Sequence, residues 1–285
     1  MRVAWVAAAY TFRELIRRKV FVVVPIVTVA FIALYAVGNL YAFDFSSGFL
    51  DDDSRVLDAR LVTGASLLGL AMFTTFFLGT VLAVFLTFGA VRGDAETGLL
   101  QPLVVRPVGR GALLLGRYLG TVVVSAGYVL LLFGLAVVTT GWIGGWWPEN
   151  VVSSALFLCS GMFVVAALSI LGSVFMTTIP NGVAVLMVYG AGLLAGLLGQ
   201  IGEALRSDGL ERVGHIASWI LPFEALYQAA LHALTAPEGG IAGFVVRLGP
   251  LGGAEPPGVW LVPWVALYIV LVGVLALSLF ARRDL

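Results

Sequence analysis

The sequence is poor in charge. Only 11% of its 285 residues are Asp, Glu, Lys or Arg, against roughly 25% in an average soluble domain. Hydrophobic residues make up 60% of the chain, and the mean hydropathy is +1.05. This composition excludes an ordinary soluble protein and predicts an integral membrane protein.

Residues that bind metals or form disulfides are also scarce. The single cysteine, Cys159, excludes an intrachain disulfide and a cysteine-based metal site, and we expect it to serve in packing. His215 and His232 lack the i,i+4 spacing of a helical metal pair, so we interpret them as surface histidines. The acidic segment 51–58 lacks the glycine and the final glutamate of a calcium loop and is interpreted as a solvated face. No metal site is predicted.

Long apolar runs dominate what is present. A helix needs about 18 or more apolar residues to cross a hydrocarbon core roughly 30 Å thick. Six runs qualify: Val20–Phe43, Leu61–Val91, Leu113–Gly141, Val151–Thr178, Gly182–Gly202 and Val259–Ala281. The second, third and fourth are long enough to tilt or to protrude from the bilayer. We predict an all-α integral membrane protein with six transmembrane helices, formed by residues 1–285 as a single domain.

The predicted spans carry almost no ionisable side chains. None contains Asp, Glu or His, and Arg117 lies at the cytoplasmic end of the third, where its side chain can snorkel. Ion- or proton-coupled carriers normally place such groups inside the bilayer. Intramembrane proteases need paired carboxylates, a metal cluster or a nucleophile with its base. The sequence therefore disfavours both classes.

Basic residues indicate the orientation, because those near span ends are retained in the cytoplasm. Residues 1–19 carry five of them, 92–117 carry four and the tail after Ala281 carries two, so eleven of the 16 fall on one side. We expect both termini to be cytoplasmic and the protein to be multi-pass in the cell membrane.

Residues 1–19 resemble a signal peptide only superficially, because their basic region is too long and no cleavage site follows. The pattern predicts an amphipathic helix in the membrane interface, with Glu14 placed to pair with Arg18. Its candidate functional residues are Phe12, Arg13, Glu14, Arg17 and Arg18. The helix either only orients the first span or also touches a cytosolic partner.

Segment 92–112, between the second and third spans, is polar and punctuated by Gly and Pro. By the orientation above, it is the charged connector between two spans on the cytoplasmic side. A membrane protein whose spans carry no charge must take the driving force for its function from elsewhere. This hinge is the candidate place where that force acts on the protein. The alternative is an ordinary loop retained by its arginines.

The start of the third apolar run has the glycine spacing of a phosphate-binding loop. Gly111 and Gly116 have the spacing of G-x-x-x-x-G-K-[ST]. However, Arg117 replaces the lysine, Tyr118 replaces the hydroxyl that would hold magnesium, and no buried strand precedes the match. We expect no ATPase activity from this chain itself.

The segment 203–258, between the fifth and sixth spans, is too long and apolar for a plain loop. Ser218–Leu234 predicts a helix opened by Pro222, and residues 236–257 are expected to be irregular. Such a helix would lie in the bilayer or against the outer mouth of the bundle. It is either a structural cap or a gate on a substrate path. The candidate gate residues are Trp219, Pro222, Phe223, Glu224 and Tyr227.

Some of the 35 glycines fall four residues apart, as in close helix packing in lipid. The pairs are Gly89 with Gly93, Gly116 with Gly120, and Gly192 with Gly196. They favour packing inside one chain, with a dimer face as the alternative.

Together these features resemble the permease subunits of ATP-binding cassette (ABC) exporters of the type-2 class. The resemblance rests on the basic N-terminal helix, six spans, and the motifs Glu96-Thr-Gly98-Leu-Leu, Arg106-Pro107, Leu114-Leu-Gly116-Arg117 and Phe280–Leu285. It covers the whole chain. Many relatives have Lys where this chain has Arg117.

The resemblance implies a division of labour. Two permease chains, here a homodimer, would form the path, and two separate ATPase subunits would bind ATP and magnesium, with no cofactor on this chain and no nucleic acid. A coupling helix in the hinge would dock on the ATPase. Mapped here, the contact would comprise Arg92, Asp94, Glu96, Thr97, Gly98, Gln101, Pro102, Arg106 and Pro107. The implied type V exporter fold also has re-entrant helices between spans five and six, which suits Trp219–Leu234.

The expected function is export of a hydrophobic or amphiphilic substrate, such as a drug, an antibiotic or a lipid-like molecule. Two alternatives remain open from the sequence. One is a membrane anchor or assembly scaffold without transport. The other is an ATP-independent carrier, which the uncharged spans disfavour.

Overall fold

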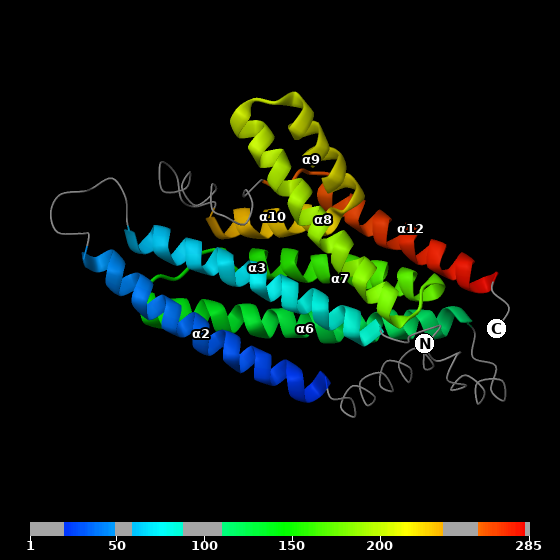
Figure 1. The fold of residues 1–285 in the computed structure, drawn as a ribbon, viewed down its shortest axis with the longest axis horizontal. Helices are drawn as coiled ribbons and strands as arrows, with labels where there is room; N and C mark the ends of the chain where they lie inside the picture. Colours follow the sequence, from blue (N-terminus) through cyan, green and yellow to red (C-terminus); the bar gives the residue numbers. More distant parts are fainter. Residues whose placement is uncertain (1–19, 49–58, 88–109, 236–255, 283–285) are drawn as a thin grey trace.

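The computed structural model describes residues 20–48, 59–87, 110–235 and 256–282, and every regular element there is a helix (Figure 1). The all-α prediction is therefore confirmed. The helices are α2 (Val20–Gly48), α3 (Ala59–Thr87), α6 (Arg110–Gly144), α7 (Val151–Phe175), α8 (Thr178–Leu205), α9 (Asp208–Ile220), α10 (Pro222–Thr235) and α12 (Leu261–Ala281).

Six of these helices, α2, α3, α6, α7, α8 and α12, are long and apolar enough to cross a membrane. They coincide with the six predicted runs but differ at some ends. The fourth ends at Phe175 rather than Thr178, because Met176 takes an extended conformation and the next helix already begins at Thr178. No charged residue marks this turn, so composition alone hides the boundary. Pro180 falls in the first turn of α8, where a missing N–H costs little.

The helix α7 is the centre of the bundle. It contacts α3, α6, α8, α10 and α12, and small buried residues such as Ser154, Gly161 and Ala166 allow the close approach. Gly161 is one point where this matters, since a β-carbon there would overlap the ring of Phe76 on α3. The main hydrophobic core therefore surrounds α7.

The longest helix is α6, with 35 residues. At 1.5 Å per residue it measures about 52 Å, well beyond the roughly 30 Å hydrocarbon core. The helix ends where Gly145 adopts a positive φ of 68° and donates its N–H to the Gly141 carbonyl at 3.1 Å. It must therefore tilt or project from the bilayer, as its sequence length predicts.

Between the fifth and sixth spans, the described residues 208–235 form the helices α9 and α10. The helices α8 and α9 make a hairpin that rises away from α2, α3 and α6, while α10 lies beside α7 (Figure 1). Arg206 makes the turn into α9 in the left-handed conformation, with φ of 52°. Inside the hairpin, Gly199 and Gly214 bring the two backbones into direct contact.

The glycines of α8 also receive α10. A β-carbon on Gly192 would overlap Phe223, and one on Gly196 would overlap Glu224. This pair therefore packs inside one chain, which is the first of the two roles expected for it. Gly116 and Gly120 are buried, whereas residues 89 and 93 lie outside the described residues.

Candidate functional site

Part of the predicted functional machinery lies outside the described residues. This holds for the nine coupling residues between Arg92 and Pro107, for the interfacial residues Phe12 to Arg18, and for the acidic segment 51–58. Their roles stay predictions. The structure does describe the helix ends on both sides of the nine coupling residues, which are Thr87 of α3 and Arg110 of α6.

A buried polar cluster fixes the end of α3, directly before the hinge. The Thr87 and Ser169 hydroxyl oxygens are 2.5 Å apart, which joins α3 to α7. Asn181, in the first turn of α8, donates from Nδ2 to the Ser169 carbonyl at 3.1 Å. All three side chains are buried, and the Asn181 carboxamide rests against Gly172, where a β-carbon would not fit. Three spans are thus tied together beside the hinge, and we call these residues the Thr87–Ser169–Asn181 cluster.

The second predicted site, in the segment between spans five and six, is fully described. The structure brings Pro222, Phe223, Glu224 and Tyr227 together on the first two turns of α10, where all four are buried. Phe223 and Tyr227 are each 1% exposed, and Glu224 is 4% exposed. The helix Pro222–Thr235 matches the helix predicted to open at Pro222.

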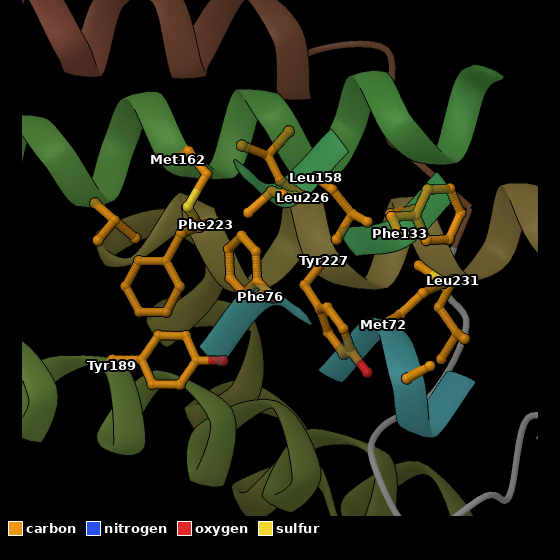
Figure 2. Packing of buried hydrophobic residues seen from close by; sticks show 14 of the residues in the cluster. Met72, Phe76, Phe133, Leu158, Met162, Tyr189, Phe223, Leu226, Tyr227 and Leu231 are labelled. Carbon is orange, nitrogen blue, oxygen red and sulfur yellow. The ribbon is translucent and has the colours of Figure 1, made fainter. Parts of the chain in front are cut away.

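The aromatic residues of α10 are part of the main buried hydrophobic cluster, in which they lie beside Phe76 and Tyr189 (Figure 2). The ring of Phe76 on α3 lies 5.8 Å from that of Tyr189 on α8 and 5.9 Å from that of Tyr227. Tyr189 and Phe223 stack at 5.7 Å. Offset and tilted aromatic contacts at these distances add specific attraction to the hydrophobic effect. The four rings form the buried contact between α3, α8 and α10, which we call the aromatic junction.

Trp219 is separate from the aromatic junction. It lies on α9, is 44% exposed, and packs against Trp264 of α12 with ring centroids 5.4 Å apart. The indole N–H of Trp264 also donates to the Trp219 carbonyl at 3.0 Å. Of the five predicted gate residues, Trp219 therefore connects α9 to the sixth span while the other four face the bundle.

Two polar features accompany the aromatic junction. Glu224 accepts a short hydrogen bond from Nε2 of Gln228, one turn further along α10. Burial, and to a lesser degree the charge of Glu224, raises the pKa of the Tyr227 phenol, which therefore stays protonated. Among the described residues, neither the Tyr227 nor the Tyr189 hydroxyl has a hydrogen-bond partner.

A cavity of about 710 Å³ lies between α8, α9 and α10. Its wall includes Glu224 and Gln228 from α10 and charged residues from α9. In the parts of the chain that the structure describes, no three His, Cys, Asp or Glu side chains lie close enough to hold a metal ion. His215 is exposed beside Trp219, and Cys159 is half-buried with its sulfur 3.9 Å from the Ala126 carbonyl.

The family model of the ABC-2 family transporter protein matches residues 5–285, almost the whole chain. The chain belongs to this family. The chain with these six candidate spans is therefore an ABC transporter permease.

Two proteins similar to the permease share the name "Probable ABC transporter permease protein NosY". The one from Stutzerimonas stutzeri is 33% identical over 112 residues, which is 39% of this chain and 38% of the relative. The one from Pseudomonas aeruginosa is 42% identical over 74 residues, or 26% of each chain. The matches thus span well under half the length of both relatives.

Sequence reasoning missed several residues of the permease's described sites. Gln228 was hidden in an apolar stretch, although its position four residues after Glu224 is a recognisable helical pair. The helix α9 was also not predicted, although Ser207 followed by Asp208 and Glu211 is a helix-start pattern. Phe76, Tyr189 and the Thr87–Ser169–Asn181 cluster join different spans, and no local pattern marks such contacts.

Proposed function

We propose that the permease is the membrane subunit of an exporter that moves a hydrophobic or amphiphilic substrate out of the cytoplasm. Drugs, antibiotics and lipid-like molecules are the substrate classes in question. Both termini are cytoplasmic in this proposal, in line with the bias of basic residues. A second copy of the chain completes the path.

The energy comes from hydrolysis of ATP, which two separate ATPase subunits bind together with magnesium. These subunits dock on residues 92–107. The observation that carries this part of the proposal is the Thr87–Ser169–Asn181 cluster. Thr87 is the last residue of α3 before the hinge, and its tie to α7 and α8 would pass a displacement of the hinge to three spans at once. The end of α3 and the start of α6 also lie at the same end of the bundle as the start of α8 (Figure 1).

At the opposite end of the path, α10 acts as the outer gate. The aromatic junction holds α3, α8 and α10 together in the conformation described here. A packed cluster of this kind has discrete arrangements rather than a continuous range, so it suits a two-state gate. Rigid-body movement of the spans, driven from the hinge, would separate these rings and open the outer side.

The test uses the permease reconstituted in vesicles with its ATPase. Glu96→Lys and Gly98→Trp should leave membrane insertion intact and abolish ATP-driven export together with substrate stimulation of ATP hydrolysis. The matched controls are Glu149→Lys, in the exposed turn between α6 and α7, and Gly127→Trp. Around the β-carbon position of residue 127, the described residues place no atom within 4 Å beyond the local backbone of α6 and the chain neighbours. Normal export by both hinge variants would refute the coupling role. An assembled wild-type complex that moves no candidate substrate would favour the scaffold function instead.

A further inference from the structure

The cavity between α8, α9 and α10 is a separate feature from the hinge and the aromatic junction, although Glu224 and Gln228 of the gate helix α10 are part of its wall. Its volume of about 710 Å³ lies within the range of small-molecule sites. The close contact of Gly199 with Gly214 holds one side of the α8–α9 hairpin together, and α10 closes the base. This cavity is therefore large enough for a small-molecule ligand, and it lies outside the main hydrophobic core.

Glu224 gives this cavity a buried carboxylate. The side chain is 4% exposed yet forms part of the cavity wall. Gly196 lets it approach α8, since a β-carbon there would overlap its carboxylate, and Gln228 donates a hydrogen bond to it. Gln228 is also buried and also part of the wall. A carboxylate in a place of low dielectric interacts far more strongly with a cation than one in water.

Acidic residues outnumber basic ones in the described wall of this cavity. Four acidic side chains are part of it, whereas Arg212 is the one arginine or lysine among its described residues. The acids are Glu203, Asp208, Glu211 and Glu224. A concave surface dominated by one sign of charge concentrates ions of the opposite sign. An anionic ligand is thus disfavoured and a cationic one favoured.

An aromatic cavity adjoins the acidic one. It measures about 300 Å³, and its wall includes Trp219, Trp260 and Trp264. The two cavities share His215, Ser218, Gln228 and Pro256, so a single ligand can reach both. Tryptophan faces attract cations and also pack well against flat apolar groups.

We propose that the two cavities together bind an organic cation. A protonated amine or guanidinium group sits in the acidic cavity and pairs with Glu224, and the apolar or aromatic body of the ligand packs against Trp219 and Trp264. A bare metal ion fits less well, because the described residues offer no group of three close ligands. The size of the cavity, the buried carboxylate and the tryptophan wall support this together, and the acids alone would not define a site.

The test measures binding to the purified full-length permease with three probes of one shape. Phenethylammonium, 2-phenylethanol and phenylacetate share a phenyl body and differ in charge. We expect saturable binding of phenethylammonium at least about tenfold tighter than that of the other two. Glu224→Gln should remove that preference, since it deletes the charge of the pairing group. Glu149→Gln, an exposed acid away from the cavity, should leave it unchanged.

A second variant keeps the proposal testable if Glu224→Gln fails to fold. Glu203→Gln with Glu211→Gln changes two exposed acids of the wall and should weaken phenethylammonium binding by about threefold. Equal binding of the three probes by the wild-type protein, or an unchanged preference in both the single and the double variant, would overturn the proposal. The hinge variants leave this measurement untouched, so the binding site and the coupling role can fail separately.

Discussion

Gly196 of α8 lies so close to Glu224 of α10 that a β-carbon at position 196 would overlap the Glu224 carboxylate. The same helix offers Gly192 to Phe223 one turn earlier. Two glycines thus set how closely α10 docks on the fifth span. This docking in turn places the aromatic junction and the buried carboxylate, so a small change on α8 affects both.

The first prediction follows directly. Gly196→Ala should destabilise the permease by about 1–3 kcal/mol, because the added methyl group forces Glu224 and Gln228 out of their positions. The unfolding free energy would be measured in mixed micelles titrated with SDS. Gly190→Ala on the same helix is the control, since the described residues place no atom within 4 Å of its β-carbon position beyond the local backbone of α8 and the chain neighbours. Alanine is the better helix former, so this variant should be neutral or up to about 1 kcal/mol more stable. Equal effects of the two changes would contradict the packing described here.

A second prediction concerns the polar cluster beside the hinge. A double-mutant cycle with Thr87→Val and Ser169→Ala should give a coupling energy of about 0.5–1.5 kcal/mol, because the two hydroxyls share a buried hydrogen bond at 2.5 Å. The matched control pairs Thr87→Val with Ser160→Ala, whose hydroxyl bonds within α7 to the Leu156 carbonyl. That control cycle should show a coupling near zero. A Thr87–Ser169 value no larger than that of the control would mean that the contact does not stabilise the end of α3.

The six spans could be predicted from the sequence, whereas the contacts of the Thr87–Ser169–Asn181 cluster could not. Each span is a long apolar run, and length with composition is enough to find it. The helix start at Pro222 was predictable because proline has a known place in a first turn. Glu224 was predicted as a candidate gate residue, and nothing local indicated its burial. That burial depends on Gly196, a partner on another helix, and one sequence without tertiary structure does not reveal such pairs.

A third prediction compares how loss of the hydroxyl group at two buried tyrosines changes the unfolding free energy. The Tyr227 hydroxyl has no hydrogen-bond partner among the described residues, whereas that of Tyr35 lies 2.6 Å from the Thr140 hydroxyl. Tyr227→Phe should therefore leave the unfolding free energy unchanged or raise it, and Tyr35→Phe should lower it by about 0.5–1.5 kcal/mol. Both variants keep the aromatic ring and differ only in the bond lost. If Tyr227→Phe were the more destabilising change, its hydroxyl would have to bond a group outside the described residues.

The last prediction tests the gate at the aromatic junction. Phe76 and Tyr227 stack at 5.9 Å between α3 and α10, so cysteines at these two positions would lie within reach of a short bifunctional thiol reagent. Cys159 is the only native cysteine, and a Cys159→Ala background leaves the introduced pair as the sole targets. If the junction must separate during export, cross-linking should abolish ATP-driven transport in reconstituted vesicles, and a reductant that cleaves the link should restore it. A pair at Tyr35 and Thr140, between α2 and α6, is the control for a link elsewhere in the bundle. Full transport by a completely cross-linked Phe76–Tyr227 pair would exclude this junction as the gate, because the rings could not have parted.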